Sequence, residues 1–125
     1  MTGTTPLDTF DEFFRLVTEA GDSEAAAHLW ASADDTVLFG SEKSDTARGF
    51  DAIQAHVKSI TSAQTTIRFT WNDRQVSTEG DVAWINATGT LDVAGKQSDY
   101  HITAVLVRRD GRWLWHTFNG SEPNN

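Results

Sequence analysis

Hydrophobic residues in the first half of the chain recur with the spacing of helices. One apolar face, at positions i, i+3, i+4 and i+7, consists of Phe10, Phe13, Phe14 and Val17. Thr5 and Pro6 are typical of a helix start, and Gly21 is typical of a helix end. We expect Ser23 to cap a second, short helix. We expect Asp51 to cap a third helix, whose apolar face carries Ile53, His56, Val57 and Ile60.

From Ile67 onward, the pattern changes to an alternation of apolar and polar residues. It predicts strands at 67–76, 82–92, 98–109 and 113–119, separated by turns at Glu79-Gly80, Ala94-Gly95 and Asp110-Gly111. A brief strand at 36–40 precedes a polar loop at 41–49. Helices followed by an antiparallel meander indicate an α+β fold with the helices packed on one face of the sheet. We expect one domain over residues 1–125.

The turns also determine which residues face each other across neighbouring strands. Counting from Asp110-Gly111 predicts the pairs Leu106–Trp115, Ala104–Thr117 and Ile102–Asn119. Counting from Ala94-Gly95 predicts the pairs Gly89–Tyr100, Ala87–Ile102 and Ile85–Ala104. Because side chains alternate between the two faces of a strand, both registers place these residues on one inner face, toward the helices.

Small residues occupy the middle of this inner face, which leaves a hollow unless Phe13, Phe14 and Trp30 fill it. A mostly apolar hollow with a few polar groups is the usual form of a small-molecule site. We therefore expect a ligand pocket between the helices and the sheet. Its expected lining is Phe14, Trp30, Phe39, Tyr100, Ile102, Ala104, Trp115, Thr117 and Asn119.

The opposite, outer face of the predicted sheet carries too much apolar area for a surface in water. The helices are assigned to the inner face, so we expect a second copy of the chain to cover the outer one, as an isologous homodimer. The expected interface residues are Trp84, Val105, Val107, Leu114, His116 and Phe118.

Composition and charge narrow the possible function classes. The chain has 125 residues, a formal net charge of −8 and no cysteine. Binding to nucleic acid or to an anionic membrane requires clustered Lys and Arg, so an acidic chain argues against both partners. The absence of cysteine excludes disulfides, thiol nucleophiles and iron–sulfur clusters. We expect a cytoplasmic protein, because residues 1–6 lack the features of a signal peptide, and we expect no cofactor and no metal ion.

A set of short segments spans nearly the whole chain: Gly21-Asp22, Leu29-Trp30, Ala33-Asp34-Asp35, Gly40-Ser41, 49–53, 103–113 and 121–123. Together these segments resemble the SnoaL-like group of the nuclear transport factor 2-like superfamily. The C-terminal part also resembles the association domain of calcium/calmodulin-dependent protein kinase II. The resemblance implies a cone-shaped α+β fold with a curved sheet around a pocket, usually dimeric.

The resemblance also implies which chemistry is missing. Ketosteroid isomerases of this fold use a tyrosine and two acidic residues, and their positions fall here on Phe14, on or beside Phe39, and near Thr103 or Ala104. Because these positions carry neither a base nor an oxyanion donor, the ketosteroid isomerase mechanism is excluded. The pocket arginines of the kinase association domain fall on Gly89, Ala104 and Gly120. The pocket is therefore expected to be neutral.

His56 is the best remaining candidate for acid–base catalysis, because it lies on the apolar face of the third predicted helix and should point inward. The alternative is a buried histidine bonded to a backbone carbonyl or to Tyr100. Tyr100 and Asn119 are candidates to hydrogen-bond an oxygen atom of a ligand.

Two functions stay open. The first is binding of a small neutral, largely apolar molecule, with or without isomerase, cyclase or hydrolase activity of the SnoaL-like type. The second is a non-catalytic homodimerisation or assembly module with a vestigial pocket. A cavity with His56 at its wall favours the first function, and an interior filled by aromatic side chains favours the second.

Overall fold

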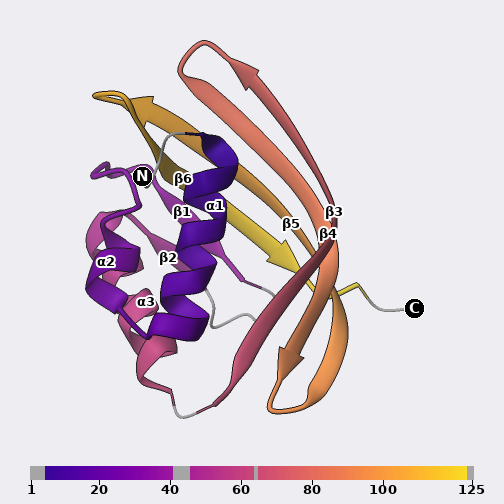
Figure 1. Cartoon of the computed structure of the whole chain (residues 1–125). Coiled ribbons are helices and arrows are strands. Elements are labelled where there is room, and N and C mark those ends of the chain that lie inside the picture. Colours follow the sequence, from indigo (N-terminus) through magenta and orange to yellow (C-terminus); the bar gives the residue numbers. More distant parts are fainter. Residues whose placement is uncertain (1–4, 41–45, 64, 124–125) are drawn as a thin grey trace.

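The computed structural model describes residues 5–40, 46–63 and 65–123. In this part of the chain, helices α1 (Pro6–Arg15), α2 (Ser23–Ala27) and α3 (Phe50–Ser62) lie on one side of a curved six-stranded sheet (Figure 1). A π-helical turn, η1 (Leu16–Ala20), extends α1. The predicted α+β class, with the helices on one face of the sheet, is confirmed.

The first helix begins where the sequence predicts. The backbone N–H of Asp8 donates to Oγ1 of Thr5 at 3.1 Å, and Pro6 occupies the first turn. Gly21 follows η1 with a φ of 64°, a left-handed conformation that glycine adopts without a steric penalty. The predicted start and end of this helical segment are therefore both correct.

Two other helix starts differ from the prediction. Asp22, rather than Ser23, caps α2, because its carboxylate accepts a hydrogen bond from the backbone N–H of Ala25 at 3.0 Å. Gly49 precedes α3, so Asp51 lies in the first turn of the helix. There its negative charge still favours the helix N-terminus.

The sheet contains β1 (Val37–Phe39), β2 (Thr46–Arg48), β3 (Ile67–Glu79), β4 (Val82–Val93), β5 (Lys96–Arg109) and β6 (Arg112–Ser121). Their spatial order is β2-β1-β6-β5-β4-β3, so the predicted meander from β3 to β6 is confirmed. The short strand β2 lies in the segment predicted to be a loop and pairs with β1. β1 in turn runs parallel to β6, a pairing that no turn in the sequence indicates.

The predicted register is correct for β4 and β5 but only partly correct for β5 and β6. Leu106 pairs with Trp115 as predicted, but Val105 pairs with Thr117, so His116 is the extra residue of a β-bulge. Beyond the bulge, Ala104 pairs with Phe118 and Ile102 with Gly120. The predicted pairs Ala104–Thr117 and Ile102–Asn119 are wrong, because one extra residue moves every later side chain to the other face.

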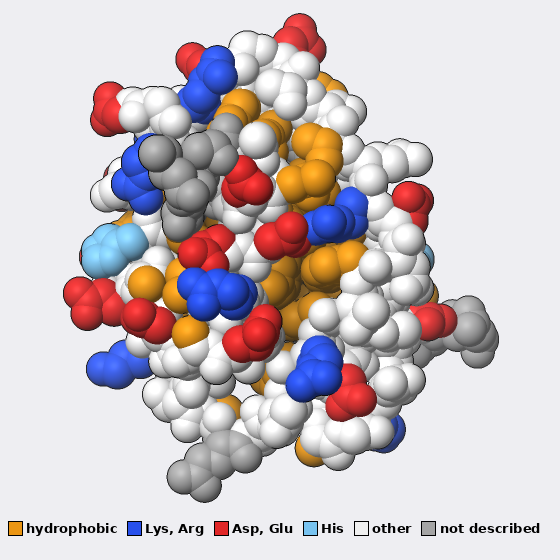
Figure 2. Space-filling view, viewed as in Figure 1, with side chains coloured by type: hydrophobic (Ala, Val, Ile, Leu, Met, Phe, Trp, Pro, Cys, Tyr) orange, Lys and Arg blue, Asp and Glu red, His pale blue; other side chains and the backbone are white. Residues whose placement is uncertain are grey.

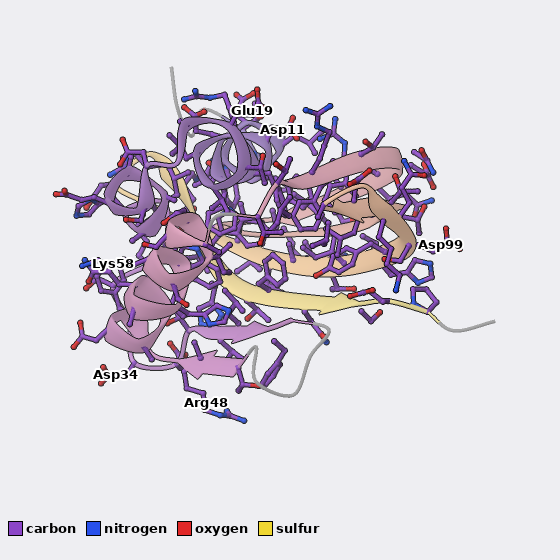
Figure 3. The ribbon with its side chains drawn as sticks, turned by 90° about the horizontal axis from the view of Figure 1, so that it is seen from below. Asp11, Glu19, Asp34, Arg48, Lys58 and Asp99 are labelled. Atoms are coloured by element: carbon purple, nitrogen blue, oxygen red, sulfur yellow. The ribbon has the colours of Figure 1, made fainter. Side chains whose placement is uncertain are left out.

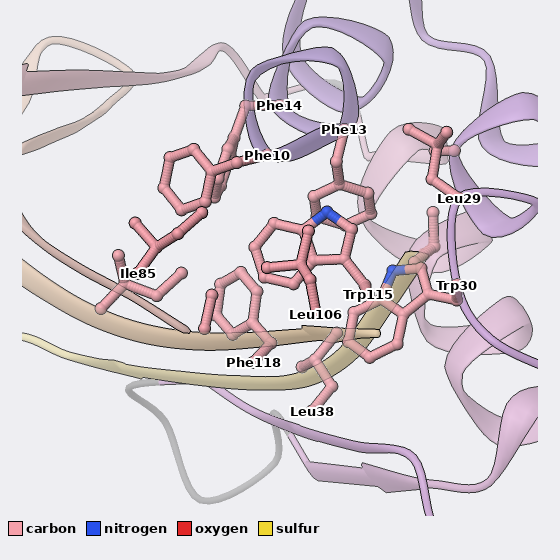
Figure 4. Packing of buried hydrophobic residues seen from close by; sticks show 14 of the residues in the cluster. Phe10, Phe13, Phe14, Leu29, Trp30, Leu38, Ile85, Leu106, Trp115 and Phe118 are labelled. Carbon is pink, nitrogen blue, oxygen red and sulfur yellow. The ribbon is translucent and has the colours of Figure 1, made fainter. Parts of the chain in front are cut away.

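Aromatic side chains fill the middle of the inner face (Figure 4). The rings of Phe10, Phe13 and Phe14 lie 5.5, 5.1 and 5.9 Å from that of Trp115, and Trp30 stacks on Trp115 at 5.6 Å. The small residues predicted to lie under a hollow belong to the same buried cluster, among them Ala87 and Ala104. In the middle of the face, therefore, the alternative expectation of an interior filled by aromatic side chains is correct.

Candidate functional site

A cavity of about 340 Å³ lies beside this aromatic cluster, between the helices and the sheet. Helices α1, η1 and α3 and strands β1, β3, β4, β5 and β6 contribute to its wall. The lining is mostly apolar: Phe13, Phe14, Val17, Leu38, Gly40, His56, Ile60, Ile67, Phe69, Leu91, Val93, Tyr100, Phe118 and Glu122. Its volume and apolar character fit the range of small-molecule sites.

Three of the residues predicted for the pocket and its chemistry line this cavity, namely Phe14, Tyr100 and His56. Four others face the inner side of the sheet but belong to the packed core instead: Trp30, Ile102, Ala104 and Trp115. They are absent from the lining because the rings of α1 cover this part of the sheet.

The remaining predicted lining residues point elsewhere. Phe39 follows Leu38, whose side chain lines the cavity, so Phe39 faces outward, where the guanidinium of Arg48 lies 5.2 Å from its ring centre. Thr117 and Asn119 lie on the outer face because of the bulge at His116, and Asn119 is exposed. The prediction of these three residues as lining is wrong for the described cavity.

Phe118 shows the same reversal in the opposite direction. Predicted for the outer face, it is only 6% exposed and lines the cavity beside Leu38, its partner residue on β1. The sequence carries a signal for this shift. The aromatic residues of the last strand stand at 113, 115 and 118, so their spacing changes from two residues to three.

Tyr100 lines the cavity, and a glycine leaves space for its hydroxyl group. It is 3% exposed, and its ring meets that of Phe69 edge-on at 5.3 Å. A Cβ atom on Gly120 would lie 1.9 Å from the Tyr100 hydroxyl oxygen. Gly120 therefore provides the space into which the hydroxyl group fits. Phe69 on the ring and Gly120 at the hydroxyl together determine where this polar group lies.

Glu122 is a lining residue that the sequence prediction missed. Its carboxylate oxygen Oε2 accepts a hydrogen bond from Oγ of Ser98 at 2.9 Å. It follows Ser121, the last residue of β6, and lines the same cavity as Phe118. With the unbulged register, the same residue would face outward. The sequence predicts a neutral pocket, whereas the wall of this cavity includes one carboxylate.

His56 comes from α3, where Ile53, Val57 and Ile60 share its face as predicted. Its Nε2 atom is buried, and the side chain lines the cavity together with Ile60. The cavity therefore combines an imidazole on the helix wall with a phenol and a carboxylate on the sheet wall.

The outer face of the sheet carries the other predicted patch. Trp84 is 37% exposed, and Val105, Val107, Leu114 and His116 are half-buried. Nε2 of His116 lies 3.3 Å from Oδ1 of Asp35, so the bulge also carries a polar contact. Of the predicted interface residues, only Phe118 is turned inward.

A larger groove of about 890 Å³ separates α1 from the edge strand β3. An apolar strip forms its floor, and charged side chains stand on both sides (Figure 2). Two of the acidic side chains, Asp11 and Glu19, are exposed on α1 and η1 (Figure 3). Within α1, the carboxylate of Glu12 hydrogen-bonds Arg15 and raises the pKa of its guanidinium. The many charges distinguish this groove from the apolar cavity.

No group of three or more His, Asp or Glu side chains in the described part of the chain is arranged to hold a metal ion. No helix among these residues is both long enough and apolar enough to cross a membrane.

Solved structures with the same fold include proteins of different roles. A putative dehydratase of the NTF2-like family from Streptomyces avermitilis is 20% identical, with a TM-score of 0.79 over 94% of this chain and 92% of that one. A putative calcium/calmodulin-dependent protein kinase type II association domain from Thiobacillus denitrificans is 16% identical, with a TM-score of 0.82 over 99% of both chains. A protein of Catenulispora acidiphila in complex with S-DNPA is 17% identical, with a TM-score of 0.73 over 93% and 89%.

At these identities the structural likeness concerns the fold alone. No curated protein sequence matches the chain closely enough to count as a relative. The sequence pattern of the SnoaL-like domain, however, matches residues 7–123. The chain therefore belongs to the SnoaL-like domain family of the nuclear transport factor 2-like superfamily.

Proposed function

We propose that the protein binds a small, largely apolar molecule in the cavity between its helices and its sheet. The observation that carries this proposal is the cavity of about 340 Å³, whose wall is apolar except at a few places. Polar groups that converge in an apolar cavity orient a ligand, whereas the apolar wall supplies most of the affinity. The complex of a structurally similar protein with S-DNPA is consistent with this use of the fold.

A cavity-filling variant tests this proposal. Val17 lines the cavity from η1, so Val17→Trp should fill part of it, whereas Val76→Trp adds the same bulk on a residue that is 38% exposed. The probe is the neutral dye N-phenyl-1-naphthylamine, whose fluorescence rises in apolar sites. We expect the wild type and Val76→Trp to bind it equally and Val17→Trp to bind it about tenfold more weakly. Equal binding by all three proteins would contradict the proposal.

In the enzymatic version of this proposal, His56 moves a proton and Tyr100 orients an oxygen atom of the ligand. A neutral imidazole in a cavity is suited to acid–base catalysis near pH 7, and a tyrosine O–H can donate to a carbonyl oxygen. Asn119, the other residue predicted to orient the ligand, is exposed and does not line the cavity.

Proton transfer can be measured on a simple ketone, 4-phenylbutan-2-one, by following the exchange of its α-hydrogens in D₂O by NMR. His56 would take the α-proton while the Tyr100 hydroxyl donates to the developing enolate oxygen. We expect His56→Gln to abolish the protein-dependent exchange. The matched control is His28→Gln, at an exposed histidine that follows α2 and does not line the cavity, and it should leave the exchange unchanged. Equal exchange by both variants would exclude His56 as the base.

A homodimer through the outer face is the second candidate function, alone or combined with ligand binding. It is favoured by the exposed Trp84 beside the half-buried Val105 and Val107, which together leave apolar surface in water. Sedimentation of the wild type, of Trp84→Lys and of the control Val76→Lys tests it, since the two side chains are 37% and 38% exposed. We expect only Trp84→Lys to sediment as a monomer. A monomeric wild type at micromolar concentration would contradict a dimer.

A further inference from the structure

Strand β3 forms a free edge of the sheet. It is the last strand in the spatial order, and within the described residues it pairs only with β4 (Figure 1). It is 13 residues long, and residues 72–79 are all exposed. The backbone N–H and C=O groups along such an edge are available to pair with another extended strand.

A β-bulge at Asn72 changes which residues of β3 face the inner side of the sheet. Before the bulge, Phe69 pairs with the buried Leu91, so odd-numbered residues face inward. After the bulge, Val76 pairs with the buried Ile85, so even-numbered residues face inward. Two antiparallel copies of β3 therefore match their faces only if odd-numbered residues of one copy lie opposite even-numbered residues of the other.

One register of this kind also pairs opposite charges. It places Arg68 opposite Glu79 and Trp71 opposite Val76, and the two-fold axis repeats both pairs. Arg68 and Glu79 are exposed, and neither forms an ion pair with another described residue. Charged side chains on an edge strand normally discourage pairing, but in this register no like charges face each other. A register shifted by two residues places Arg68 opposite Ser77 and leaves Glu79 without a partner.

We infer that the free edge of β3 binds the same edge of a second copy of the chain, in the register that pairs Arg68 with Glu79. The contact is isologous, and it joins the two sheets into one. The partner strand lies along the groove beside α1, where its inner-facing side chains cover part of the apolar strip (Figure 2). Such a contact is small, so we expect a dissociation constant on the order of 100 µM. It goes beyond the proposed function, because it uses neither the cavity nor the outer face.

Charge reversal tests the pairing of Arg68 with Glu79. Every protein in this series also carries Trp84→Lys, which removes the proposed outer-face contact. By sedimentation, we expect Trp84→Lys alone to be monomeric at about 10 µM and mostly dimeric at about 1 mM. Arg68→Glu and Glu79→Arg should each weaken dimerisation at least about tenfold, and their combination should restore it. The control Lys58→Glu, at an exposed residue of α3, should leave dimerisation unchanged.

Disulfide cross-linking tests the register without the Trp84→Lys change, since the chain has no cysteine. In the inferred register the exposed Thr70 lies opposite the exposed Ser77. Within one chain these residues are roughly 23 Å apart along the strand, so a disulfide between them has to join two copies. With copper phenanthroline and air as oxidant, the variant with Thr70→Cys and Ser77→Cys should form a covalent dimer on a non-reducing gel. Ser77→Cys alone, and the combination of Thr70→Cys with Gln75→Cys that matches the shifted register, should remain monomeric.

Three results would overturn the inference. The first is a monomer at about 1 mM in the Trp84→Lys series. The second is a charge-swapped protein that dimerises no better than its two single variants, and the third is equal cross-linking of the two cysteine pairs. None of these results affects the ligand cavity or the outer-face dimer, because neither depends on the free edge of β3.

Discussion

Adding one methyl group at Gly120 should displace Tyr100 and destabilise the fold. A Cβ atom there would lie 1.9 Å from the Tyr100 hydroxyl oxygen and 2.6 Å from its Cζ atom. Because non-bonded carbon and oxygen atoms keep about 3.5 Å apart, the hydroxyl would have to retreat by roughly 1.5 Å. Tyr100 is buried against Phe69, so the ring has little room to move.

The expected magnitude follows from this overlap. Overpacking of this kind costs about 1–3 kcal/mol, so we expect Gly120→Ala to lower the free energy of unfolding by about 2 kcal/mol. For a domain of this size, that corresponds to a fall in Tm of roughly 6–10 °C. Urea unfolding followed by tryptophan fluorescence measures the change, and Ser121→Ala, at an exposed neighbour on β6, is the control.

A double-mutant cycle identifies the cause of the loss. Tyr100→Leu removes both of the closest atoms, so Gly120→Ala should cost at least about 1 kcal/mol less in that background. Some cost will remain, because Cε1 of Phe118 would lie 3.0 Å from the new Cβ atom. An undiminished cost in the Tyr100→Leu background, or no cost in the wild type, would refute the position that we assign to the Tyr100 hydroxyl.

Three further predictions concern the sheet, each measured by urea unfolding. Phe118→Ala should cost about 3–4 kcal/mol and Asn119→Ala less than about 0.5 kcal/mol, because the bulge turns Phe118 inward; the reverse order would indicate the unbulged register. Gly89→Ala should cost more than about 2 kcal/mol, since its Cβ atom would lie 1.9 Å from the carbonyl oxygen of Thr70, and a loss below about 1 kcal/mol would contradict that close approach. Ala94→Gly should stabilise by about 0.5–1 kcal/mol, because Ala94 has a φ of 54°, and a destabilised variant would argue against this turn conformation.

The parts of the fold that sequence reasoning predicts well are those set by local chemistry. The Ala94-Gly95 turn has positive φ at both residues and fixes the whole register of β4 and β5. Thr5 and Gly21 likewise determine helix ends through their own conformations. Such signals act over a few residues, so they can be interpreted from the local sequence without knowing the rest of the structure.

The parts that it misses depend on contacts between distant segments. β2 is three residues long and contains one apolar residue, Ala47, so it has no periodicity to detect. It pairs with β1, and β1 pairs with β6, which lies far along the chain, so neither pairing follows from the local sequence. The filling of the inner face also depends on distant segments, because the distance between α1 and the sheet determines how many aromatic rings fit over Ala104.

The bulge at His116 decides the chemistry of the cavity as well as its register. Without the extra residue, Thr117, Asn119 and Ser121 would face inward, and the cavity wall would be polar and uncharged. With it, the inward positions are Phe118, Gly120 and Glu122, which supply an apolar wall, space for the Tyr100 hydroxyl and a carboxylate. One inserted residue therefore changes an uncharged cavity wall into one with a carboxylate. When two proteins of this fold are compared, the residues of the last strand that face inward have to be matched before a ligand is inferred.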